Sequence, residues 1–173
     1  MCLSFAVTAE PAPQSESPTV PREVRRTVEL LAGYWTFRGT DTEPGKSEPA
    51  TVSMEIDCKS ASLGVAVVCR LRGTVTGFGP VEATSLVGYD PEEKVVHWME
   101  ISSTGEYHDH KGPWKDDRVV FEALTYTVAG KKCTERFSLL FPAPNKMRLK
   151  SVTKTADGES RIEGLAIRNE KQF

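Results

Sequence analysis

The side chains best suited to chemistry are four polar residues close together in the chain, His97, Glu106, His108 and His110. The last three are spaced two residues apart, so on a β-strand they point to one face. Two imidazoles and a carboxylate form a ligand set for zinc, iron or nickel. Residues 106–111 contain no aliphatic side chain, which is equally typical of a solvated strand end. A metal site, a polar patch facing a ligand and a solvated edge all stay open, and we expect no bound metal.

Glu100 is a second candidate, because it shares a strand face with Trp98. Inside a barrel, the indole would keep water from the carboxyl group and raise its pKa, which suits proton transfer or recognition of a basic ligand. Alternatively, Glu100 lies near the open end of its strand and contacts water. The predicted ligand-binding residues are Phe37, Trp98, Glu100, Glu106, His108, Phe121 and Phe137.

Other catalytic arrangements are missing from the sequence. There is no G-x-S-x-G element, and the serines and cysteines have no histidine partner at a recognisable spacing. Arginines inside a barrel can hold a carboxylate, but the strand arginines lie opposite apolar neighbours, and we predict that they point outward. These arginines are Arg70, Arg72, Arg136, Arg148 and Arg161. We therefore favour a protein that is not an enzyme.

The elements that must position these residues are β-strands. After residue 33, apolar and polar residues alternate along the chain, which predicts strands with one face in a core and one wetter face. The ten predicted strands cover residues 34–40, 51–58, 65–76, 80–89, 94–102, 104–111, 118–128, 131–141, 146–155 and 159–168.

The connections between these strands are short and rich in turn residues, as at Asp90-Pro91 and Asp157-Gly158. None is long enough for a crossover helix, so we expect an antiparallel up-and-down sheet. Ten strands leave exposed edges unless the sheet closes, and a closed sheet of this size is a barrel that can hold a small ligand. The expected fold class is an all-β, ten-stranded barrel, with a two-sheet sandwich as the alternative.

Two segments precede the strands. The first is rich in Pro, Ser and Glu and poor in large apolar side chains, which predicts a disordered arm over residues 1–20. Pro21 suits the first position of a helix. Apolar residues then follow at helical spacing as far as Leu31, which predicts one short amphipathic helix. Residues 21–173 would form a single barrel domain.

Composition excludes several classes of partner. The 173 residues carry a formal net charge of −2, whereas nucleic-acid binding needs a clustered basic face. No stretch approaches the roughly 18 apolar residues of a membrane span. The N-terminus lacks the basic region of a signal peptide, so we expect a cytoplasmic protein. The cysteines have no metal-site spacing, and we predict structural free thiols rather than reactive or disulfide-bonded ones.

Three segments of the chain resemble a known family. Leu31-Ala32-Gly33-Tyr34-Trp35, then Gly88-Tyr89-Asp90 with Lys94, then Trp98 with Ser103-Thr104-Gly105, resemble the bacterial family DUF1579. Glu100 departs from the pattern, since the family often has Asp there. The resemblance implies a calycin-type barrel, like those of lipocalins, nitrobindin and fatty-acid-binding proteins, with Trp35 at its closed end. Haem of the nitrobindin kind would need a histidine near the last strands, whereas all three lie within residues 97–110.

Three functions are consistent with these features. The leading hypothesis is a non-enzymatic barrel that binds a small, apolar or amphipathic molecule, because amphipathic strands rich in aromatic residues can enclose a cavity. The second is an enzyme that uses the polar residues at 97–110, either with a metal or as a general acid/base pair. The third is a structural or homodimeric interaction module with a filled interior. We expect no cofactor.

Overall fold

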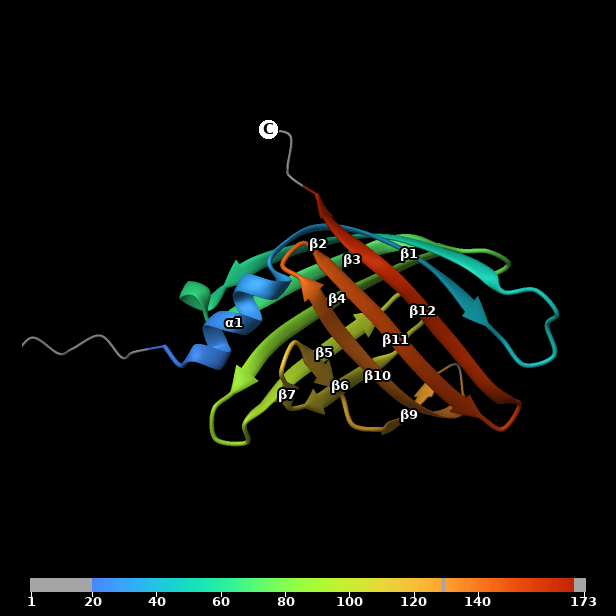
Figure 1. Cartoon of the computed structure of the whole chain (residues 1–173). Helices are drawn as coiled ribbons and strands as arrows, with labels where there is room; N and C mark the ends of the chain where they lie inside the picture. The colour runs from blue at the N-terminus through green and yellow to red at the C-terminus, as the bar shows by residue number, and fades with distance from the viewer. Residues whose placement is uncertain (1–19, 129, 170–173) are drawn as a thin grey trace, which may run out of the picture.

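One helix covers one end of a barrel of antiparallel strands (Figure 1). The computed structural model describes residues 20–128 and 130–169, so the predicted arm lies outside the described residues except for Val20. The elements are α1 (Arg22–Leu31), β1 (Gly33–Thr42), β2 (Ala50–Ala61), the 3₁₀ turn η1 (Ser62–Gly64), β3 (Ala66–Val75), β4 (Gly79–Asp90), β5 (Val95–Ser102), β6 (Tyr107–Gly112), β7 (Trp114–Lys115), β8 (Arg118–Val120), β9 (Leu124–Val128), β10 (Lys131–Ala143), β11 (Lys146–Thr155) and β12 (Gly158–Asn169).

The sheet has the predicted up-and-down order. Neighbours in the chain are neighbours in the sheet from β1 to β6 and from β10 to β12. Pairing of β1 with β12, in which Phe37 lies opposite Ala166, joins these two runs. All strand pairs among the described residues are antiparallel. The all-β, antiparallel, up-and-down sheet expected from the sequence is therefore confirmed.

The barrel nearly closes where β6 meets the segment that follows β8, and we call this line of contact the seam. The Glu122 amide donates a hydrogen bond across the seam to the Lys111 carbonyl oxygen, with an N–O distance of 2.8 Å. A Cβ atom added to Gly112 would lie 2.3 Å from the Val120 carbonyl oxygen. Glycine at position 112 therefore allows the two backbones to approach.

The prediction of ten strands is wrong, since the sheet has twelve within residues 20–128 and 130–169. The predicted strand 118–128 is divided into β8 and β9. Between them, the Phe121 amide bonds to the Phe137 carbonyl, but the Glu122 amide turns away from β10 and bonds across the seam. The short β7, which pairs with β8, was not predicted. The strand predicted from residue 104 begins at Tyr107, because the preceding residues form a turn.

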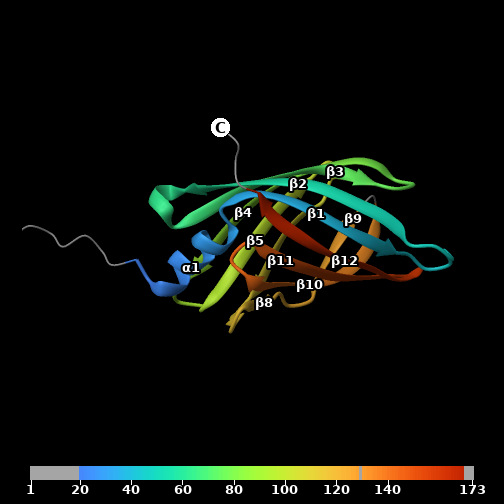
Figure 2. The same ribbon diagram turned by 45° about the horizontal axis from the view of Figure 1, so that its top comes forward.

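The helix α1 closes its end of the barrel through its apolar side, on which Val24 and Leu31 are buried (Figure 2). Trp35, at the start of β1, is fully buried and donates from its indole nitrogen to the Leu31 carbonyl at 2.9 Å. Trp114 similarly donates to the Thr27 hydroxyl at 3.0 Å. Trp35 thus lies beside the helix at the closed end, as the resemblance implied. At ten residues α1 is too short to cross a bilayer, and the described part of the chain offers no other candidate helix.

Three rings fill the middle of the barrel, and we call Trp98, Phe121 and Phe137 the aromatic core. Phe121 and Phe137 stack with their centroids 4.1 Å apart. The Trp98 ring meets both of them edge-on, at 6.2 and 5.8 Å. Such stacked and edge-to-face pairs add to the stabilisation from burial alone. This part of the interior is filled by the protein's own side chains.

The prediction of free thiols is wrong for two cysteines. Cys58 of β2 and Cys69 of β3 lie directly opposite each other in the paired strands and form a disulfide. Although 11 positions apart in the chain, they are brought together by the hairpin register. Cys133 is a free, buried thiol, as predicted. Cys2 lies outside the described residues.

Candidate functional site

The four polar residues that the sequence singled out are divided between the two faces of the sheet. His97 lies on the outer face, where its Nδ1 is 2.9 Å from an Asp109 carboxylate oxygen. His108 and His110 are buried inside the barrel, with ring centroids 4.7 Å apart. Register decides this difference, because His110 lies opposite the inward-pointing Trp98 whereas His97 lies opposite Lys111. The interior histidines therefore exclude the solvated-edge interpretation for residues 108 and 110.

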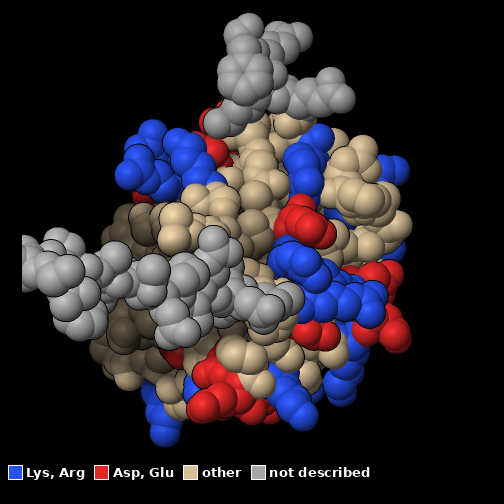
Figure 3. All heavy atoms as spheres, turned by 90° about the vertical axis from the view of Figure 1, so that its left-hand side faces the viewer, with Lys and Arg blue, Asp and Glu red and all other residues tan. Residues whose placement is uncertain are grey.

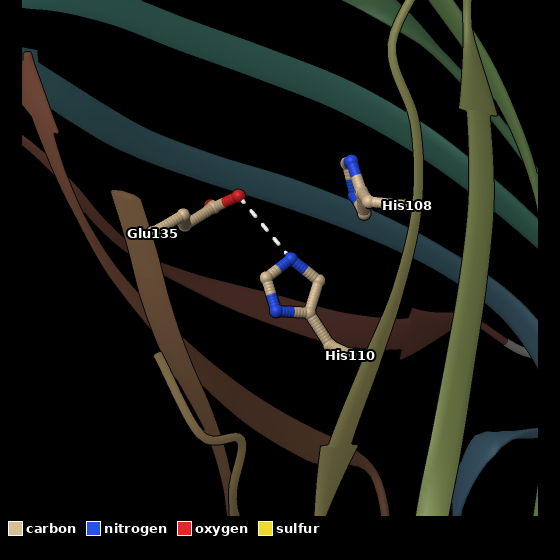
Figure 4. A group of neighbouring side chains, drawn as sticks. All are labelled: His108, His110 and Glu135. Carbon is tan, nitrogen blue, oxygen red and sulfur yellow. Dashed lines mark ion pairs between the residues drawn. The ribbon is translucent and has the colours of Figure 1, made fainter. Parts of the chain in front are cut away.

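His110 is fully buried but poorly satisfied. Its Nε2 lies 3.4 Å from the Glu135 carboxylate of β10, on the far side of the seam (Figure 4). Neither ring nitrogen of His110 has a hydrogen-bond partner among the described residues, and the same is true of Nδ1 of His108. Buried polar atoms are nearly always hydrogen-bonded, so unpartnered ones point to an additional bound group. The two imidazoles are therefore available to a ligand.

Glu135 is the functional residue that the sequence reasoning missed. Its carboxylate accepts hydrogen bonds from the Tyr126 hydroxyl at 2.6 Å and the Ser151 hydroxyl at 2.5 Å. Burial raises the pKa of Glu135, but the neighbouring His110 ring and the two hydroxyl groups outweigh this effect and lower the pKa to about 2. The alternation along this strand could have identified Glu135, because it lies two residues before Phe137 and therefore points to the same face of the strand.

Glu100 accepts two hydrogen bonds from neighbouring side chains, in agreement with the interior one of the two interpretations that the sequence left open. One of its carboxylate oxygens accepts from the Ser85 hydroxyl at 2.6 Å and from the Trp98 indole at 3.1 Å. Ser85 lies opposite Glu100 in the paired strands β4 and β5, so cross-strand register creates the contact. The carboxylate thus lies directly beside the aromatic core.

Glu106 lies in the connection between β5 and β6, directly before Tyr107. Its carboxylate accepts from the Ser102 hydroxyl at 3.0 Å. The ligand atoms that lie within 4.8 Å of one another belong to His108, His110 and Glu135, so Glu135 takes the place that the sequence assigned to Glu106. Burial lowers the pKa of His108, as does the nearby His110, while the charges of the surrounding carboxylates oppose this shift. His108 lies opposite Glu100 in the paired strands β5 and β6, and one of its ring nitrogens lies within 4.8 Å of a Glu135 carboxylate oxygen.

These inward-pointing residues form one group, which we call the polar cluster: Glu100, Glu106, His108, His110, Tyr126, Glu135 and Ser151. The arginines that the sequence placed on outer faces, Arg70, Arg72, Arg136, Arg148 and Arg161, are all exposed. The cluster is therefore rich in carboxylates and accepts hydrogen bonds or positive charge. Among the predicted ligand-binding residues, Phe37, Phe121 and Phe137 are buried in the core beside it.

A groove lies outside the barrel, beside α1. This groove of about 850 Å³ is lined by Arg22, Arg25 and Arg26 of the helix and by Asp116 and Asp117 of the β7–β8 turn, with residues 141–144. Figure 3 faces this end of the molecule and shows basic side chains next to acidic ones. Arg26 is already engaged, because it bonds to the Asp116 carbonyl and lies over the Trp114 ring. The groove contains none of the predicted site residues.

Comparisons with known proteins identify the fold. No family model matches the sequence, and no curated protein matches it. Rv2717c from M. tuberculosis superposes with a TM-score of 0.62 at 13% identity, covering 85% of this chain and 98% of that one. The S-type phycobiliprotein lyase CPES from Guillardia theta gives 0.60 at 14% identity, covering 86% and 94%. The chain has a calycin-like barrel fold. EF1p2_mFAP2b bound to DFHBI gives 0.50 at 10% identity, covering 84% and 99%, and all these likenesses concern the fold alone.

Proposed function

We propose that this protein is a non-enzymatic barrel that binds a small amphipathic molecule whose polar end carries a cationic or hydrogen-bond-donating group. The observation that carries this proposal is a set of three glutamates near His108. Glu100 lies opposite His108 in the paired strands, a Glu135 carboxylate oxygen lies within 4.8 Å of a His108 ring nitrogen, and Glu106 lies two residues before His108. Buried carboxylates without a function are costly, because charge must be taken out of water. A ligand that brings positive charge or donors would offset this cost and gain specificity.

The remainder of the ligand would lie against apolar side chains at the end of the barrel away from α1. Met54, Leu71 and Val75 point inward there, pack against the core and stay partly exposed. Ligand sites of this kind combine apolar walls with a few polar groups that fix orientation. The fold is shared with a phycobiliprotein lyase and with a DFHBI-bound protein, which supports a role in holding a small molecule.

Binding of two surfactants that differ only in their charged end tests this proposal. We expect dodecylamine, titrated calorimetrically into chelator-treated protein, to bind more tightly than dodecanoate. Glu100→Gln should weaken amine binding about tenfold or more, because a hydrogen bond to a charged group contributes about 1.5–3 kcal/mol. Glu82→Gln is the matched control, since Glu82 is a mostly exposed carboxylate on the outer face of β4.

Equal affinity for amine and carboxylate, or no binding of either, contradicts the proposal. It is also contradicted if Glu82→Gln weakens amine binding as much as Glu100→Gln does. Native mass spectrometry of the purified protein provides an independent measurement, because a copurified organic molecule should be lost on denaturation. Its mass would then define the ligand further.

Two expectations from the sequence stay predictions. Relation to the family DUF1579 rests on the motif residues quoted above. The expected cytoplasmic location is opposed by the Cys58–Cys69 disulfide, because disulfides are rare in reducing compartments. The location can be tested by counting free thiols in protein whose cysteines are alkylated as the cells are lysed. A reduced Cys58–Cys69 pair favours the cytoplasm, and an oxidised pair favours an oxidising compartment.

A further inference from the structure

We propose that His108, His110 and Glu135 form a binding site for a divalent transition-metal ion inside the barrel. One nitrogen of each imidazole and one carboxylate oxygen of Glu135 all lie within 4.8 Å of one another. Ligand atoms in a tetrahedral zinc site, with bonds of about 2.0–2.1 Å, are about 3.3 Å apart. Small side-chain rotations that move these atoms by roughly an ångström would therefore bring all three within bonding distance of one ion.

The unpartnered nitrogens provide the second observation. The His110 side chain is 0% exposed, and neither of its nitrogens forms a hydrogen bond. Its separation of 3.4 Å from Glu135 is longer than a charge-assisted hydrogen bond of about 2.7–2.9 Å. The 3.4 Å between His110 Nε2 and the Glu135 carboxylate does match the distance between two ligand atoms on one metal ion. The pair is thus better placed for a shared cation than for direct bonding.

The residues around Glu135 complete the site. Tyr126 and Ser151 donate hydrogen bonds to its two carboxylate oxygens and fix its orientation. Metal ligands in proteins are commonly held in this way by outer-shell donors, whose loss weakens metal affinity about 10- to 100-fold. The Tyr126 ring also packs against His108, with ring centroids 4.6 Å apart. Tyr126 therefore positions two of the three ligands.

The donor set selects the class of ion. Imidazole nitrogens suit zinc, cobalt, nickel and iron, whereas calcium and magnesium prefer oxygen ligands only. Two histidines and one glutamate leave a fourth tetrahedral position for water or for a ligand atom. This site does not depend on the amphipathic ligand proposed above, because its three protein ligands are sufficient to hold the ion.

A second group of similar residues, Asp90, Glu93 and His97, lies on the outer face and serves as the control. Most of its ligand atoms already have partners. Asp90 accepts from two backbone amides, Glu93 pairs with Lys111, and Nδ1 of His97 pairs with Asp109, which leaves Nε2 of His97 as the atom of this group without a hydrogen bond to the described part of the chain. These groups are also exposed or only partly buried, so water competes for any ion. We therefore assign no site there.

Titration of chelator-treated full-length protein with Zn²⁺ and with Co²⁺ tests the inference. We expect one ion per chain, absorption bands of four-coordinate Co²⁺ in the visible spectrum, and no binding of Mg²⁺ or Ca²⁺. His108→Gln and Glu135→Gln should each weaken Zn²⁺ binding by more than about 100-fold, because removing a metal ligand should cost more than removing an outer-shell residue. Tyr126→Phe should lose about 10- to 100-fold. His97→Gln and Glu82→Gln, which change side chains on the outer face, should bind as the unaltered protein does.

The outcomes separate the inference from its rivals. Absence of stoichiometric Zn²⁺ binding overturns it, as does unchanged affinity in both His108→Gln and Glu135→Gln. Loss of binding in His97→Gln alone would assign the ion to the outer face and would also overturn it. Circular dichroism of each ion-free variant shows that it is folded. Zn²⁺ should raise the thermal midpoint of the unaltered protein and of Glu82→Gln but not that of His108→Gln.

Discussion

The aromatic core and the polar cluster lie next to each other in one barrel, yet they are built in opposite ways. Trp98, Phe121 and Phe137 contact one another through stacked and edge-to-face rings. In the polar cluster, by contrast, the fully buried His110 has no hydrogen-bond partner and faces the Glu135 carboxylate. The first arrangement stabilises the native state by itself. The second leaves a fully buried imidazole without a hydrogen bond to any described residue. If the proposed ligand or ion binds there, stability and binding are assigned to different parts of the same interior.

Removal of a ring from the aromatic core should have the largest effect. Phe121 is fully buried and contacts Phe137 and Trp98, so Phe121→Ala leaves a cavity that its neighbours cannot fill. We expect a loss of about 3–5 kcal/mol in the free energy of unfolding, measured by urea denaturation. Phe78→Ala is the control, because this aromatic side chain is 65% exposed and should change stability little. A loss below about 1 kcal/mol for Phe121→Ala would show that the core is not the stabilising layer.

The polar cluster should respond differently to single and combined changes. Glu135→Leu leaves Tyr126, Ser151 and His110 without their common partner, and we expect a loss of about 1–3 kcal/mol in the free energy of unfolding. The combined variant Glu135→Leu, Tyr126→Phe, Ser151→Ala and His110→Leu removes all of these groups together. It should lie within about 1 kcal/mol of the unaltered protein, because replacing every partner leaves no buried group unsatisfied.

Urea denaturation of both variants, without metal, makes this comparison. If the combined variant is less stable than Glu135→Leu alone, the polar cluster contributes to stability in its own right. The contrast with the aromatic core would then fail. Retention of metal binding by the combined variant, which lacks two of the three proposed metal ligands, would equally separate binding from the cluster.

The smallest effect on stability is expected in the turn between β4 and β5, which belongs to neither the aromatic core nor the polar cluster. One carboxylate oxygen of Asp90 accepts from the amides of Glu92 and Glu93, at 2.7 and 3.0 Å, and these bonds lower the pKa of Asp90. A carboxyl group with a lowered pKa stabilises the native state above its unfolded pKa, and this contribution is lost as the pH falls through the folded value. Asp90→Ala should therefore lower the urea midpoint slightly at pH 7, and the difference should shrink below about pH 4.

Glu92→Ala is the matched control for this turn, since Glu92 is exposed and its side chain is not part of these two bonds. A difference between Asp90→Ala and the unaltered protein that stays constant between pH 7 and pH 3 contradicts the assigned role of the carboxylate.

Much of the fold could be predicted because period-two alternation is a local property of the chain. It identified the long strands, and the short connections required antiparallel order. It failed between Arg118 and Val128, where Glu122 pairs with β6 and interrupts the strand, since a contact between distant segments leaves no local pattern. The disulfide was missed for a similar reason, because hairpin register rather than spacing brings Cys58 and Cys69 together.

The candidate site was predictable only in part. Spacing placed His108 and His110 on one face, and the neighbouring Trp98 placed Glu100 inside. Glu135 lies far along the chain, and barrel curvature rather than sequence proximity brings it to the histidines. Glu106 satisfied the spacing rule but bonds to Ser102 at the end of β5. A ligand set assembled from several strands is thus predictable only once the closure of the sheet is known.

The seam has a consequence for exchange with solvent. β6 is paired through its length with β5, but across the seam no strand ladder holds it to β7 or β8 among the described residues. Segments with few backbone bonds open locally at a lower free energy than the whole domain. We therefore expect β6 amides to exchange hydrogen for deuterium sooner than those of β1 and β12, which are paired on both sides. β6 carries both His108 and His110, so local opening of β6 at the seam would expose both imidazoles through the side of the barrel. Release of an ion from the proposed metal site would then be limited by the rate at which β6 opens.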